Sequence, residues 1–166
     1  MTKEQKEFLN LAIVEQQNYS EIEHQMGVAR KDLSTWWEEL KIEREELSKI
    51  RQLWKKKFEA AKINDYDTFY AFKDWYEKTK RACHYCEITK PQMDELWEKD
   101  SKLTKRNRGR NLEIERLKPN LDYDEISNLV YCCYWCNNAK TDTFSEEEFI
   151  EVGKVFKKIW SDRLKN

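Results

Sequence analysis

Two Cys-x-x-Cys pairs constrain this chain more than any other feature of its sequence. Cys83 and Cys86 form the first pair, and Cys133 and Cys136 form the second, far along the chain. Each pair bends the backbone so that both sulfurs face one centre, and four thiolates from two such pairs are typical of a closed, tetrahedral zinc site. The sequence therefore predicts a structural Zn²⁺ bound by these four cysteines.

The composition favours helices over a many-stranded sheet. The chain has only three glycines and two prolines among 166 residues, so it is poor in the residues that make tight turns. Seven tryptophans and an aromatic content of 13% supply enough large apolar groups for one moderate core or two small ones. We therefore expect a mainly α fold with a small α+β module around the zinc.

The charge balance, the absence of long apolar runs and the cysteine content limit the possible partners and the cellular compartment. Charged residues make up 38% of the chain but leave a net charge of -1, so any affinity for nucleic acid has to come from local clusters. The sequence has no N-terminal signal segment and no apolar run near the ~20 residues of a membrane span, which predicts an intracellular, cytoplasmic protein without a membrane partner. In a reducing compartment the paired cysteines are expected to be metal ligands, and Cys132 is expected to be a small buried apolar group.

Residues 1–41 predict an N-terminal domain of three helices. The first helix is expected to begin after Thr2, which can cap it. The second is expected to begin at a capping box over 20–23 and to end at Gly27, which can adopt the left-handed conformation that stops a helix.

A third helix is expected over 30–40. The order of helix, tight turn and helix is typical of a helix-turn-helix domain, in which the second helix of the pair lies in the DNA major groove. The alternative is a plain three-helix bundle that does not bind DNA. The residues expected to contact DNA are Arg30, Lys31, Ser34 and Thr35.

Residues 42–80 predict long connecting helices. Apolar residues recur at three- and four-residue spacings, which favours one helix over 42–63. A second helix is expected to be capped at Asp67 or Thr68. These helices would space two domains, and they could support a homodimer.

Residues 81–166 predict the zinc module and a C-terminal helix. Alternating apolar and polar residues indicate strands, and capping residues indicate where helices begin. The expected elements are a helix opened by Pro91, strands over 112–116 and 129–131, a helix opening at 137–140, and a last helix capped by Ser145.

A basic loop over 102–110 precedes the first of these strands. It carries five positive charges and no acidic residue, which suits phosphate contact through charge and counterion release. The alternative is a solvated loop without a partner. The residues of this loop expected to bind nucleic acid are Lys105, Arg106, Arg108 and Arg110.

The order and spacing of these residues resemble the HNH family of nucleases, which have the ββα-metal fold. The four-cysteine branch of that family combines two Cys-x-x-Cys pairs with an Asp-His pair at the end of the first strand. It also has an Asn before the second strand, and an Asn and a Lys after the last cysteine. Similar proteins of phages and mobile elements carry an acid-Arg pair instead, which indicates a bacterial or phage-like source. The matching residues here are Cys83, Cys86, Glu115, Arg116, Asn128, Cys133, Cys136, Asn137 and Lys140.

This resemblance implies a DNA endonuclease or nickase that the N-terminal domain directs to its target. Glu115 and the side-chain oxygen of Asn137 would bind one catalytic Mg²⁺ or Mn²⁺, distinct from the zinc, because hard oxygen ligands suit such an ion. The ion would stabilise the phosphate and the leaving oxygen as a Lewis acid. Asn128 would orient the residue on the opposite strand, and Lys140 would contact the nucleic-acid backbone.

One residue departs from the family pattern. Arg116 stands where the family has its general-base histidine, and a guanidinium does not give up a proton near neutral pH. Tyr123 and a metal-bound hydroxide are candidate replacements, while Arg116 would stabilise charge on the phosphate. His84 is expected to be a zinc-loop residue and His24 a surface residue.

Two functions of other classes remain open. The first is a DNA-binding protein that keeps the zinc and the fold but does not cut DNA. The second is a zinc-stabilised interaction module without affinity for nucleic acid, which leaves the basic loop unexplained.

Overall fold

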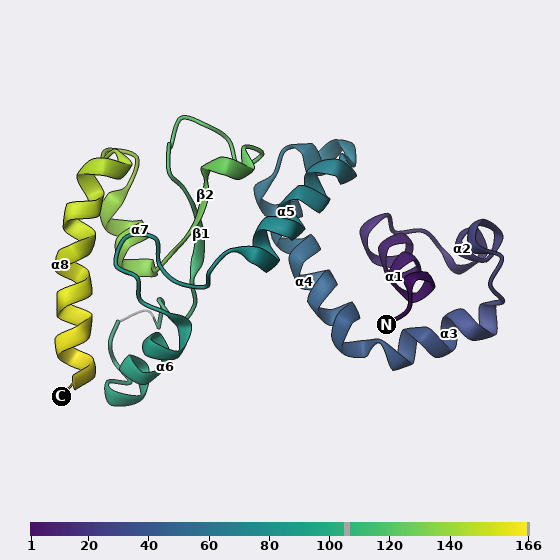
Figure 1. The fold of residues 1–166 in the computed structure, drawn as a ribbon, viewed down its shortest axis with the longest axis horizontal. Coiled ribbons are helices and arrows are strands. Elements are labelled where there is room, and N and C mark those ends of the chain that lie inside the picture. Colours follow the sequence, from purple (N-terminus) through teal and green to yellow (C-terminus); the bar gives the residue numbers. More distant parts are fainter. Residues whose placement is uncertain (105–106, 166) are drawn as a thin grey trace. The chain divides into compact units, whose positions relative to one another are not determined.

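The computed structural model describes residues 1–104 and 107–165. Within them the chain is mainly helical and contains one two-stranded antiparallel sheet, as the composition predicts (Figure 1). The chain divides into two compact units, Met1–Glu77 and Lys78–Asn166. None of the described helices is both long enough and apolar enough to cross a membrane.

The first unit is entirely helical. Its core contains Phe8, Ile22, Leu33, Ile50 and Trp54, each at most 1% exposed. Its elements are α1 (Lys3–Leu9), a π-helical turn (Asn10–Val14), α2 (Tyr19–Met26), α3 (Arg30–Glu39), α4 (Lys41–Lys57), a 3-10 turn (Ala60–Ile63) and α5 (Tyr66–Lys78), whose last residue belongs to the second unit.

The ends of α1 and α2 show which capping predictions hold. Thr2 caps α1, and Gly27 ends α2 with a φ of 66°. The predicted capping box over 20–23 is wrong, because α2 begins two residues earlier. There Asn18 accepts hydrogen bonds from the backbone of Ser20 and Glu21, and an Asn caps a helix as well as a Ser does.

The connecting helices differ from their prediction in two ways. The helix predicted over 42–63 ends at Lys57, because Phe58 adopts an extended conformation and packs its ring 4.9 Å from that of Phe72 on α5. The second difference is the cap of α5, which was predicted at Asp67 or Thr68. The cap is Asp65, whose carboxylate accepts hydrogen bonds from the backbone and hydroxyl of Thr68.

These helices form part of the first unit's core. Nε of Arg51 on α4 donates to the carbonyl of Val14 at 2.9 Å, and Trp54 packs edge-on against Phe69 of α5. The break between compact units therefore falls after Glu77, near the predicted start of the zinc module at residue 81.

The second unit contains the sheet. Strands β1 and β2 pair in antiparallel register, with Glu115 opposite Val130 and Arg116 opposite Leu129. Figure 1 shows α8, in yellow, running along the side of this unit beside α7 and α6. Its elements are α6 (Lys90–Lys99), β1 (Glu113–Arg116), a 3-10 turn (Ile126–Asn128), β2 (Leu129–Cys132), α7 (Tyr134–Lys140) and α8 (Glu146–Lys165).

Helix α8 packs on the first cysteine pair through Phe149 and Gly153. Phe149 is 1% exposed and lies edge-on to Tyr85, with ring centroids 5.0 Å apart. Ser145 and Glu148 form the predicted capping box at its start. The apolar residues Val152 and Ile159 of this helix are each 39% exposed, because Gly153 is the residue that faces the first knuckle.

We predict that Gly153→Ala destabilises the protein although alanine favours helices. A Cβ at this position would lie 2.5 Å from the carbonyl oxygen of Tyr85, and backbone atoms cannot easily move aside. Overpacking of this kind costs about 1–3 kcal/mol, against a gain in helix propensity of about 1 kcal/mol. Thermal denaturation should show a lower Tm than for the wild type and for the control Ser161→Ala on the exposed side of α8. An unchanged Tm would contradict the close packing.

Candidate metal centre

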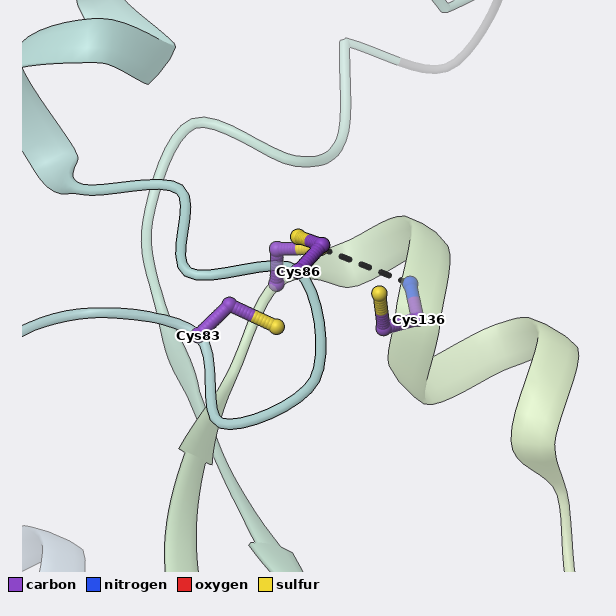
Figure 2. A group of neighbouring side chains, drawn as sticks. Cys83, Cys86 and Cys136 are labelled. Atoms are coloured by element: carbon purple, nitrogen blue, oxygen red, sulfur yellow. Dashed lines mark hydrogen bonds between the residues drawn. The ribbon is translucent and has the colours of Figure 1, made fainter. Parts of the chain in front are cut away.

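The four cysteines of the two Cys-x-x-Cys pairs lie together in the second unit. All are buried, and their sulfur atoms lie within 4.8 Å of one another. Figure 2 shows the sulfurs of Cys83, Cys86 and Cys136 gathered from a loop and from the start of α7. In a tetrahedral zinc site with bonds of about 2.3 Å the sulfurs are roughly 3.8 Å apart. The sulfurs of Cys86 and Cys133 are 3.6 Å apart, so this donor set fits a structural Zn²⁺.

Backbone hydrogen bonds shape the first pair into a knuckle. The amide of Cys83 donates to the carbonyl of Ile88, and the amide of Glu87 donates to the carbonyl of Cys83. Glu87 closes this turn with a positive φ of 62°. The amide of His84 donates to the carbonyl of Tyr131 on β2 at 2.7 Å. This last bond holds the first knuckle against the strand that leads into the second.

The second knuckle is the start of α7. Cys133 follows β2 directly and caps the helix, and its sulfur accepts a hydrogen bond from the amide of Cys136 at 3.4 Å. A dashed line ends at this amide nitrogen of Cys136 in Figure 2. Helix α7 therefore begins at Tyr134, three residues before the predicted start at Asn137, because the cysteine sulfur serves as its cap.

Because the four sulfurs lie so close together, metal binding is coupled to the release of protons from the thiols. Hydrogen bonding with the sulfurs of Cys136, Cys83 and Cys86, in that order, raises the pKa of the Cys133 thiol. A bound cation would displace those protons, since thiolates are the metal-binding form. Cys132 is fully buried, as predicted, and its sulfur lies 4.0 Å from that of Cys83.

The face of the sheet beside these cysteines carries two carboxylates. Glu113 and Glu115 are alternate residues of β1 and therefore lie on one face of the strand. Asn137 on α7 reaches this face, where its Nδ2 donates to Oε2 of Glu113 at 2.5 Å. Burial raises the pKa of Tyr85 in the first knuckle, and nearby negative charge, including that of Glu115, adds to the effect. Two carboxylates and an amide oxygen are donors that fit Mg²⁺ or Mn²⁺.

Asn128 fastens the chain just beyond β1. It is 4% exposed, its Oδ1 accepts from the amide of Lys118 at 2.8 Å, and its Nδ2 donates to the carbonyl of Lys118 at 3.0 Å. Its own carbonyl accepts from the amide of Leu117. Asn128 thus makes three hydrogen bonds to the segment that follows Arg116, and its predicted role in orienting the residue on the opposite strand stays a prediction.

Arg116 lies on the other face of the strand from Glu115. Its Nη1 donates to the carbonyl of Leu121 at 3.2 Å, and its guanidinium lies 5.0 Å from the ring centre of Tyr123. The side chain of Arg116 is therefore held by the turn that follows β1, which also contains Tyr123, one of the two predicted replacements for a general base.

Lys140 and the basic loop occupy different environments. Lys140 is 1% exposed, so the predicted contact with a nucleic-acid backbone is not open to its ammonium group. Within the loop, the backbone at Gly109 packs on the start of α7, where a Cβ would lie 3.2 Å from Tyr134. Arg108 is exposed, and Arg110 lies over the ring of Trp97 at 4.1 Å. The predicted residues Lys105 and Arg106 lie outside the described part of the chain.

The predicted DNA-contacting residues of α3 are all exposed on the first unit. Arg30 lies 5.8 Å from the ring centre of Tyr19. The hydroxyls of Ser34 and Thr35 donate to the carbonyls one turn earlier on their own helix, and their oxygens can still accept a hydrogen bond. His24 is exposed, as predicted.

Sequence reasoning missed two contacts at this centre. Glu113 was detectable, because the two-residue period of a strand puts it on the face of Glu115. The other is the ion pair between Nε2 of His84 and Oε1 of Glu146 at 2.7 Å, which joins the first knuckle to α8. No sequence signal connects those two residues, since only the packing of α8 brings them together.

Comparisons with known proteins found no match among family models, curated proteins or solved structures.

We predict that Cys133→Ser removes the metal and unfolds the second unit, whereas Cys132→Ala retains it. A structural zinc site contributes about 10–16 kcal/mol of binding energy to folding, and Cys133 also caps α7. Metal analysis should give about one Zn²⁺ per chain for the wild type and for Cys132→Ala, and near-UV circular dichroism should report the loss of packing in Cys133→Ser. Retention of zinc by Cys133→Ser would contradict the assignment.

Proposed function

We propose that this protein is a metal-dependent endonuclease or nickase of the HNH type that hydrolyses phosphodiester bonds in DNA. One observation carries the proposal: beside four clustered cysteines, the amide of Asn137 reaches the carboxylate face of β1. The resemblance of the sequence to the HNH family supports it, and the order of two antiparallel strands followed by a helix agrees with the ββα-metal fold.

In this proposal one set of residues would have a structural role and another would bind the catalytic ion. The cysteines would hold Zn²⁺ and keep β2 and α7 together. Glu115 and Oδ1 of Asn137 would hold the catalytic ion, which supplies Lewis-acid stabilisation of the phosphate. Asn128 would fix the chain after β1 through its bonds to Lys118.

Two basic surfaces would bring DNA to this face. The loop that includes Arg108 and Arg110 packs on the start of α7, the helix that carries Asn137. In the first unit, Arg30 and Lys31 are exposed at the start of α3, the second helix of the proposed helix-turn-helix. Both surfaces offer cations to phosphate groups.

A DNA-binding protein that does not cut is the second candidate. The position of Arg116 favours it, because the guanidinium is engaged with the carbonyl of Leu121 and the ring of Tyr123 and no general base occupies that place. This candidate predicts salt-sensitive binding to DNA that needs no divalent ion.

Cleavage of supercoiled plasmid DNA in Mg²⁺ or Mn²⁺ tests the proposal. We predict that Glu115→Ala and Asn137→Ala each lower the rate at least about a hundredfold, since each removes a ligand of the ion that stabilises the transition state. The matched control is Asn138→Ala, because this neighbouring side chain is exposed and donates only to the carbonyl of Tyr134.

The control should cut like the wild type, and zinc content should be equal in all variants. Cutting that survives both Glu115→Ala and Asn137→Ala would refute the nuclease. DNA binding without any cutting, by the wild type as well, would establish the second candidate.

Removing the two cations of α3 should weaken DNA binding in a salt-dependent manner. For Arg30→Ala combined with Lys31→Ala, we predict that the slope of log affinity against log salt becomes shallower by about 2, because two phosphate contacts are lost. Fluorescence anisotropy with duplex DNA measures this slope. The matched control combines Lys41→Ala with Lys49→Ala, which removes the same charge from exposed positions of α4. An equal effect of both pairs would indicate that only net charge matters.

A further inference from the structure

Glu113 is in direct contact with one of the two residues of the proposed ion site. It opens β1, lies on the same face as Glu115, and is partly buried. In the sheet it is opposite Cys132, next to the cysteine that caps α7. Its carboxylate is thus placed by the zinc frame and faces the helix that carries Asn137.

The hydrogen bond between these residues determines which way the amide of Asn137 points. A carboxylate only accepts hydrogen bonds, so the group that faces Oε2 of Glu113 has to be the NH₂ of the amide. The two atoms are 2.5 Å apart, and a bond to a charged acceptor is stronger than a neutral one. The amide oxygen is therefore directed away from Glu113, and within the described part of the chain it accepts no hydrogen bond.

That orientation is the one an ion requires. A divalent cation binds the oxygen of an amide and is repelled by its NH₂ group, so a freely rotating Asn137 would spend part of its time facing the wrong way. Residues that hydrogen-bond to a metal ligand fix its orientation, and their removal typically costs 10–100-fold in metal affinity.

We propose that Glu113 is a positioning residue that holds the oxygen of Asn137 ready for the divalent ion. The inference rests on the proposed ion site, and it adds a residue that acts through Asn137 by a hydrogen bond. The oxygen acceptor matters for this role, whereas the negative charge of Glu113 is secondary.

Binding of Mn²⁺ alone to the zinc-loaded full chain tests the inference. Isothermal titration calorimetry should show an affinity at least about tenfold weaker for Glu113→Ala, and an affinity within about threefold of the wild type for Glu113→Gln, whose side-chain oxygen accepts the same hydrogen bond. The matched control is Glu98→Ala, which removes a carboxylate from an exposed position of α6 in the same unit and should bind like the wild type.

The side-chain amide signals of Asn137 give a second readout that general loss of stability does not produce. These signals are identified in ¹⁵N-labelled protein as the ones that Asn137→Ala lacks. The Nδ2 protons should be protected from exchange with solvent in the wild type and in Glu113→Gln, and they should exchange freely in Glu113→Ala. Wild-type affinity in Glu113→Ala, or equal weakening in Glu113→Gln, would overturn the positioning role alone. A wild type that binds no Mn²⁺, or an Asn137→Ala variant that binds it normally, would overturn the proposed ion site itself.

Discussion

The cluster of four buried cysteines is the interaction on which the second unit depends. In the part of this unit that the structure describes, the helices are accompanied by one short two-stranded sheet, and such a sheet is marginally stable by itself. The cysteines join the loop after α5, the end of β2 and the start of α7, which are distant in sequence. Helix α8 then covers the first knuckle through Phe149 and Gly153.

Soft and hard ligands sit on neighbouring residues of one helix. Cys136 turns its sulfur into the cluster, whereas Asn137, the next residue, turns its amide to the carboxylate face of β1. A thiolate site suits Zn²⁺, and an oxygen site suits Mg²⁺ or Mn²⁺, so the two proposed ions need not compete. The same helix turn would thus separate structural and catalytic chemistry.

Much of this arrangement could be predicted because its signals are local. The cysteine spacing, the alternation in β1 and β2, and the caps at Thr2, Gly27 and Ser145 each depend on a few neighbouring residues. The failures involve tertiary contacts. Packing of Phe58 on α5 ends a helix whose apolar spacing continues.

In the candidate site, too, local features could be predicted and tertiary contacts could not. Its elements could be predicted, but the burial of Lys140 and the contact between Glu113 and Asn137 depend on how α7 lies against the sheet. The sequence pattern after Cys136 marks Lys140 as a conspicuous basic residue, but a pattern does not record which side chains a helix buries. Exposure is a property of packing, which single-sequence patterns describe least well.

Cys133 belongs to the cysteine cluster and also caps α7, and this has a consequence for how the protein would mature in a cell. One sulfur has both roles, so loss of the predicted zinc would also disturb the start of the helix that presents Asn137. Under the proposed function, a newly made chain would therefore have to bind zinc before its ion site could form. Zinc supply would then determine when the proposed nuclease activity begins.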